Sequence, residues 1–99
     1  MDARLSGAMT EVRSLLDLPQ GAELPPRAIV EDTLTTGYAY ALDLEGERLR
    51  IERQLRSLLR SGDPAGAEVK EAAGRLEVAV RELAHVRALL SSLRSQALN

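Results

Sequence analysis

Cysteine is absent from this 99-residue chain, and the aromatic residues that usually fill a protein core are nearly absent too. Without cysteine, the sequence excludes disulfides, thiol catalysis and cysteine-containing metal sites. It has no Phe, no Trp and only two Tyr, so its interior must be built from Leu, Val, Ile and Ala. Because aromatic side chains contribute most to a thick core, this composition favours helices packed side by side.

Long apolar runs are also missing. None approaches the roughly 20 residues that a membrane-spanning helix needs, and "MDARLSGAMTEVRSLLDL" lacks the apolar middle of a signal peptide. The absence of cysteine fits a reducing compartment. We therefore expect a cytoplasmic protein. Its richness in Ala, Arg and Leu suggests a GC-rich bacterial gene.

An excess of either charge is lacking as well. Charged residues make up 28% of the chain, the net charge is −2, and acidic and basic residues interleave. Such a balance gives no global field that would attract nucleic acid or a membrane. The arginine-rich stretch around Arg53 and Arg56 is interrupted by Glu47 and Glu52 and has no aromatic residue for base stacking. We expect neither nucleic acid nor membrane as a partner.

Residues 1–17 are predicted to form an N-terminal amphipathic helix. Apolar residues recur there at helical spacings, namely Leu5, Met9, Val12, Leu15 and Leu16. The following segment, residues 18–26, reads "LPQGAELPP". Its three prolines and one glycine predict a linker that ends the helix.

Residues 27–99 carry two long apolar stripes that predict helices over about 27–60 and 67–97. Both stripes repeat at alternating spacings of three and four, which is typical of a coiled-coil seam. Between them, "SGDPAG" predicts a helix stop and a tight turn, with Asp63 capping the next helix and Pro64 in its first turn. The seam positions are Val30, Leu34, Gly37, Ala41, Leu44, Arg48, Ile51, Leu55 and Leu58, and then Val69, Ala72, Leu76, Ala79, Leu83, Val86, Leu90, Leu93 and Ala97.

The short turn makes the two long helices antiparallel neighbours. Folding the chain about residues 63 and 64 places Gly37 opposite Leu90 and Ala41 opposite Val86, so that large residues often meet small ones. The fold class that we expect is therefore all-α: a short N-terminal helix followed by a long antiparallel two-helix coiled-coil hairpin.

The hairpin does not use all of its apolar surface. The first helix is too short to cover the rest, and a chain of this size buries a modest share of its surface alone. We expect a homodimer that forms a helical bundle, or a protein partner with its own amphipathic helix. The predicted interface residues are Tyr38, Leu42, Leu49, Leu59 and Leu89.

Two tyrosines stand in "TTGYAYALDLEG". Helical spacing places Tyr38 beside the seam and Tyr40 toward its edge. We interpret them as gap fillers at an interface, with their hydroxyls reaching water. The alternative is that they line a ligand site together with the flanking threonines.

Catalytic and metal-binding patterns are weak. The single histidine, His85, falls on the polar side of its helix, and Glu-x-x-His occurs once, at Glu82 and His85. A di-metal helical bundle needs such a pair on each of two helices. No phosphate loop, HExxH or GxSxG motif is present. We expect no enzyme, no metal site and no cofactor.

Arg48 is the one charged residue within the seam, and Glu45 and Glu52 flank it at helical spacing. Paired charges at a seam fix register and partner choice. The alternative is a pocket in which arginines bind a small anion, since guanidinium groups grip phosphate bidentately. Its residues would be Arg48, Arg50, Arg53 and Gln54. Basic residues near a helix C-terminus also suit the helix dipole without any ligand.

Two functions follow from these patterns. The first is a non-enzymatic interaction module (an adaptor, a chaperone or a sequestering regulator) that acts through coiled-coil helix packing. The alternative is a small-ligand-responsive regulator, anti-sigma-like, in which a nucleotide-type anion binds the arginines at the helix interface. Fold shape alone does not choose between them.

Overall fold

The computed structural model describes residues 3–19, 23, 25–62 and 66–98. Over these residues the chain forms three helices and no strand: α1 (Ala3–Leu16), α2 (Arg27–Arg60) and α3 (Ala67–Leu98). The all-α class and the antiparallel pair of long helices are confirmed.

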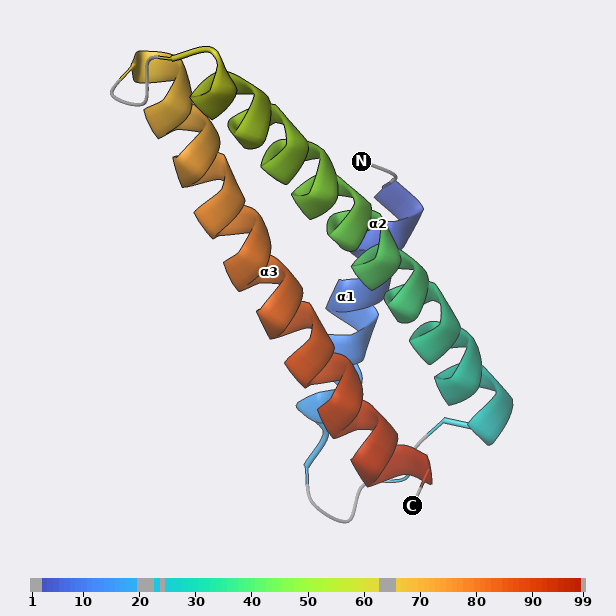
Figure 1. Cartoon of the computed structure of the whole chain (residues 1–99). Coiled ribbons are helices and arrows are strands. Elements are labelled where there is room, and N and C mark those ends of the chain that lie inside the picture. Colours follow the sequence, from blue (N-terminus) through green and yellow to red (C-terminus); the bar gives the residue numbers. More distant parts are fainter. Residues whose placement is uncertain (1–2, 20–22, 24, 63–65, 99) are drawn as a thin grey trace.

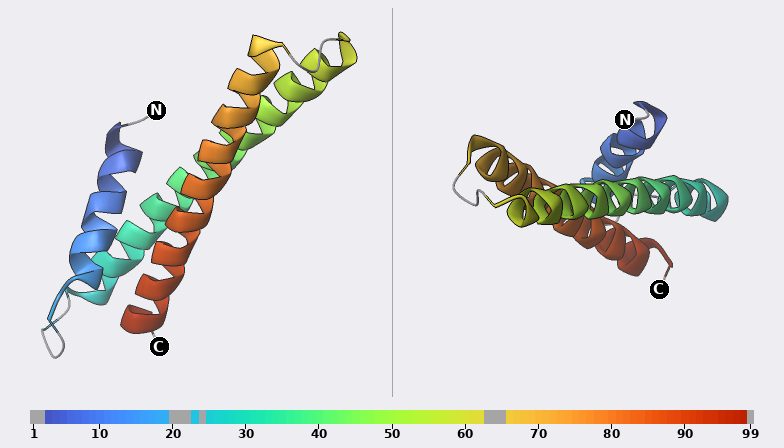
Figure 2. Two further views of the ribbon diagram at one scale, coloured as in Figure 1. Left: turned by 90° about the vertical axis from the view of Figure 1, so that its left-hand side faces the viewer. Right: turned by 45° about the horizontal axis from the view of Figure 1, so that its top comes forward.

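The long helices α2 and α3 lie side by side along their lengths, and the turn joins them at one end (Figure 1). Helix α1 packs on one face of this hairpin, along the half that is distant from the turn (Figure 2). The molecule measures 58 × 22 × 21 Å. It is therefore a rod with three helices in one half and two in the other.

The seam between α2 and α3 is the one that the apolar repeat predicts. Each predicted seam position is buried or half-buried, including the charged Arg48. The register is confirmed at Gly37, where a Cβ atom would overlap Cδ2 of Leu90. Gly37 thus lets a fully buried leucine fill the space beside α2.

Helix α1 completes the core of the half distant from the turn. Met9, Val12 and Leu15 are buried and belong to one cluster with Leu34 and Leu90. The side chain of Leu5, predicted on the same stripe, lies outside the described residues. Because α1 contributes a stripe of aliphatic side chains, this half has a three-helix core without an aromatic-rich interior.

The end of α2 is fixed by local hydrogen bonds. The Ser61 hydroxyl donates to the Leu58 carbonyl at 2.7 Å, and Gly62 follows with φ of +97°. This left-handed conformation favours glycine, since a Cβ atom would be strained there. The predicted cap Asp63 and Pro64 lie outside the described residues. Helix α3 begins after Gly66, whose carbonyl accepts a hydrogen bond from the Val69 amide at 3.1 Å.

The interpretation was wrong for the Tyr40 hydroxyl, and the interface role of Tyr38 stays a prediction. Tyr40, expected at the edge with its hydroxyl in water, is only 5% exposed, and its hydroxyl donates to Glu82 Oε1 at 2.6 Å. Tyr38, expected beside the seam, is 42% exposed. The reason is α1, which enlarges the buried arc of α2 on the side of Tyr40 and leaves the side of Tyr38 uncovered.

Candidate partner-binding groove

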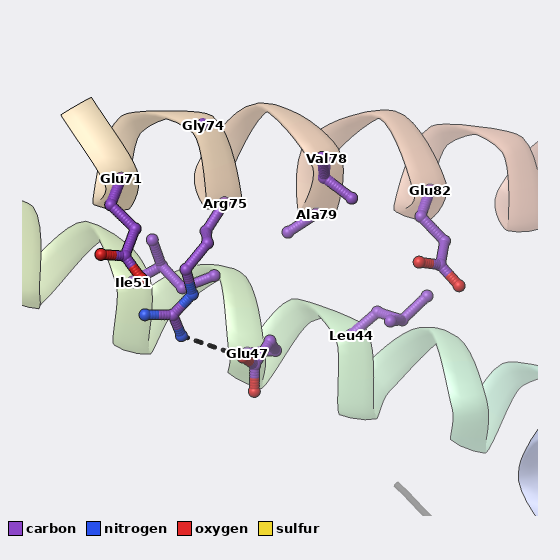
Figure 3. A pocket seen from close by; sticks show the side chains of 9 residues that line it. All are labelled: Leu44, Glu47, Ile51, Glu71, Gly74, Arg75, Val78, Ala79 and Glu82. Atoms are coloured by element: carbon purple, nitrogen blue, oxygen red, sulfur yellow. Dashed lines mark ion pairs between the residues drawn. The ribbon is translucent and has the colours of Figure 1, made fainter.

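A groove of about 480 Å³ runs between α2 and α3 in the half of the hairpin that is nearer the turn. Leu44, Ile51 and Ala79 are buried and form its floor. Figure 3 shows Arg75 and Glu82 reaching from α3 toward α2 across this space. The lining is mostly apolar, and its residues are Leu44, Glu47, Ile51, Glu71, Gly74, Arg75, Val78, Ala79 and Glu82.

The groove lies on the face of the hairpin that α1 covers farther along. Spacings of seven place Thr33, Tyr40 and Glu47 on one side of α2. Thr33 borders α1, and Tyr40 belongs to the core cluster that includes α1. On α3, His85 meets α1 through Arg13, and Glu82 lies one turn before it on the same side. The groove therefore continues the trough in which α1 sits.

The rim of the groove is charged and partly paired. Arg50 donates to Glu47 at 2.9 Å and lowers the pKa of Glu47 below its usual value, while partial desolvation opposes this shift and Arg75 adds to it. The Arg75 guanidinium lies 3.8 Å from Glu47 and donates to the Gln54 side chain at 3.4 Å. Glu71 is exposed and has no ion pair within the described part of the chain. The rim thus keeps an acidic excess.

The opposite face carries the network predicted around Arg48. Arg48 pairs with Glu45, and it donates to Glu52 at 2.7 Å. Arg87 of α3 reaches the other oxygen of Glu45 at 3.0 Å. The hydrogen bond from Arg48 is the main cause that lowers the pKa of Glu45, and Arg87 contributes further. The network links the two helices through Arg87 and Glu45, and the register-fixing role of these charges stays a prediction.

The four residues predicted to bind an anion do not converge. Positions 48 and 50 lie about 160° apart around a helix axis, and their arginines pair with carboxylates on opposite faces of the hairpin. Arg53 is exposed, and Gln54 accepts from Arg75 on the side of the groove. An anion at Arg48 would have to displace Glu45 or Glu52. The anion site stays a prediction without a formed pocket around all four residues.

Of the predicted interface residues, four are exposed. Tyr38, Leu42 and Leu49 have exposed fractions of 42%, 73% and 39%, and Leu59 is 46% exposed near the turn. Leu89 differs, since it is half-buried and packs against the core of its own chain. The exposed set leaves an apolar surface on α2 that is separate from the groove.

Among the described residues, no three His, Asp or Glu side chains gather as a metal site would require, and no helix in the described ranges combines the length and apolarity needed to cross a bilayer. His85 is exposed, and its Nε2 lies 3.5 Å from the Arg13 guanidinium. This histidine thus contacts α1 rather than a cluster of potential ligands.

The seam repeat predicted the floor residues Leu44, Ile51 and Ala79, but it did not point to Val78 and Gly74 at the rim of the groove. Val78 is 61% exposed although it is apolar, and Gly74 stands in the helix interior with nothing within 4 Å of a built Cβ. An apolar residue off the seam and an interior glycine were the available signals. These two signals indicate a groove only when the position of α1 is known, because α1 determines which face of the hairpin is covered.

No family model, curated protein or solved structure matches this chain.

Proposed function

We propose that this protein is a non-enzymatic interaction module that docks a helix of a partner protein in the groove between α2 and α3. The observation that carries the proposal is the continuity of the groove with the trough of α1. In the half distant from the turn, α1 already packs there as a third helix. In the half nearer the turn, the same face presents the exposed Val78 above the buried Leu44 and Ile51, with no third helix of the described chain over it.

The physical argument is the same for a partner helix as for α1. An amphipathic helix gains free energy by burying its apolar stripe in a groove formed by two others. Val78 gives the groove an exposed apolar wall. A partner helix placed there would complete a three-helix cross-section along the whole rod.

Site-specific photo-crosslinking in the native host tests this function. A photoreactive residue at position 78 is expected to give a discrete adduct with one protein. The matched control is position 80, because Val80 lies on the same helix but lines a different surface with Ala73 and Ala84. Binding of the purified adduct protein should then be lost in Val78→Lys and kept in Val80→Lys. Identical adducts from both positions, or adducts of the chain only with itself, would exclude a partner helix in the groove.

A further inference from the structure

The groove rim has an acidic excess that restricts what can dock there. Glu47, Glu71 and Glu82 line it together with the Arg75 guanidinium. Arg50 pairs with Glu47 beside the groove, so these three carboxylates and two guanidiniums carry a net formal charge of −1. Glu82 accepts a hydrogen bond from the Tyr40 hydroxyl, and Arg50 partly neutralises Glu47, but both carboxylates remain beside the groove. The exposed Glu71 has no ion pair in the described ranges. A docked helix would therefore meet negative potential at its flanks.

The negative potential of the groove disfavours a second copy of this chain as its occupant. Two grooves placed face to face would bring together six carboxylates and four guanidiniums, because each copy contributes three carboxylates and the guanidiniums of Arg50 and Arg75. Like charges across an interface oppose association. The opposite face has no such excess, because Glu45 and Glu52 are balanced there by Arg48 and Arg87. Self-association is thus disfavoured in the groove and not on the opposite face.

The floor of the groove sets the length of the contact. Leu44 and Ile51 are seven residues apart on α2, which corresponds to about two turns, or about 10 Å along the axis. A helix seated there would present apolar residues at i, i+4 and i+7. Gly74 at the rim has open space where a Cβ would stand, so a partner can approach α3 closely at this point.

Given the function proposed above, we infer that the occupant of the groove is a basic amphipathic helix of a different protein. It carries an aliphatic stripe about two turns long, flanked by Lys or Arg residues that face Glu71 and Glu82. Recognition combines burial of the exposed Val78 side chain against the apolar stripe with charge complementarity at the rim.

Two synthetic helical peptides test the inference on the full chain. Both are about 16 residues long, since shorter helices are marginal in water, and they share one leucine stripe. One has lysines beside the stripe and the other has glutamates. Fluorescence anisotropy is expected to show at least about tenfold tighter binding of the basic peptide. Because the rim is exposed, this preference should shrink as salt is raised.

Variants of the chain locate the binding. Val78→Lys is expected to weaken binding of the basic peptide by about tenfold or more, whereas Val80→Lys should leave its binding unchanged. Glu71→Lys should weaken binding of the basic peptide severalfold. Glu77→Lys is the matched control: it makes the same change of charge on the same helix, but Glu77 lines the other surface and pairs with Arg81.

The possible outcomes separate this inference from the function on which it rests. Equal binding of both peptides, or tighter binding of the acidic one, with loss in Val78→Lys, would overturn the basic partner and keep the groove as a docking site. An equal effect of Glu71→Lys and Glu77→Lys would also overturn it, because the charge recognition would not be local. Failure of the crosslink at position 78 would overturn the function itself.

Discussion

Two glycines inside the long helices have opposite surroundings. A Cβ at Gly37 would overlap the fully buried Leu90, whereas a Cβ at Gly74 would meet nothing. Gly37→Ala is therefore expected to destabilise the fold by about 1–3 kcal/mol through overpacking. Gly74→Ala should stabilise it by up to about 1 kcal/mol, since alanine is the better helix former. Urea denaturation of both variants measures the two signs.

A double variant identifies the cause at Gly37. Leu90→Ala alone creates a cavity and should cost about 2–5 kcal/mol. Once the leucine is gone, Gly37→Ala should cost nothing further, because its methyl group occupies the vacated space. If the two costs simply add, the overlap with Leu90 is not what makes glycine necessary at this position.

Glu45 gives the fold a dependence on pH. Its pKa is lowered in the folded chain by Arg48 and Arg87. A carboxylate with a depressed folded pKa contributes stability above its unfolded pKa and loses that contribution as the pH falls through the folded pKa. The stability difference between the natural chain and Glu45→Gln should thus be present at pH 7 and shrink below pH 4.5, the ordinary value.

Chemical denaturation at pH 7 and pH 3 checks this expectation. Glu11→Gln serves as the control, because Glu11 is exposed and has no ion pair in the described part of the chain. Its effect should be small at both pH values. An undiminished effect of Glu45→Gln at pH 3 would show that the carboxylate charge contributes nothing to folding.

At the scale of the elements, the long helices could be predicted because their information is local and periodic. The seam repeat sets which side of each helix is buried, and the short turn sets the antiparallel direction. Gly37 and Leu90 illustrate this, since counting from the turn was enough to pair them. The fold class and the register required no knowledge beyond the chain itself.

The position of α1 could not be predicted in the same way. Its stripe predicts that it packs on something, but either face of the hairpin offers apolar residues. In the structure Tyr40 is buried, Tyr38 is exposed, and Leu89 is half-buried and packs against the core. The groove could not be predicted for the same reason, because it lies on the hairpin face beyond the end of α1. Nonlocal packing, rather than propensity, decides these features.

The two halves of the hairpin should differ in local stability. Beyond Ile51, the rest of α2 has no buried position among the residues described, and Leu55 and Leu58 are only half-buried. Local opening is easiest where few apolar contacts are lost. Hydrogen exchange is therefore expected to be faster in residues 52–60 and 67–71 than in 33–44 and 83–93. Uniform protection along both helices would contradict this view of the turn half as the weaker part.

The whole molecule is longer than a compact domain of its size. Its radius of gyration is 17.4 Å, against about 13 Å for a compact chain of about 100 residues. A rod exposes more surface than a sphere, so association gives it more to bury. Two separate surfaces are available, namely the acidic groove and the face that carries Leu42 and Leu49.

We propose that the homodimer predicted from the sequence would form through the second of these surfaces. Tyr38, Glu45 and Glu52 form one row at spacings of seven, and Leu42 and Leu49 lie beside it. Leu42 is 73% exposed, and the network that Glu45 and Glu52 form with Arg48 and Arg87 is neutral, so two copies would bury leucines without opposing charge. Contact by the same patch on both copies would give a two-fold symmetric pair.

Small-angle scattering at increasing micromolar concentrations tests this dimer. The scattering mass should double from 10.8 kDa, while the longest dimension stays near 58 Å, because rods that pair side by side gain width rather than length. The double variant Leu42→Lys with Leu49→Lys should remain monomeric, since it replaces apolar contact with like charge. Val78→Lys, on the other face, should dimerise as the natural chain does. A monomeric mass for the natural chain throughout, or a lengthened particle, would rule out this dimer.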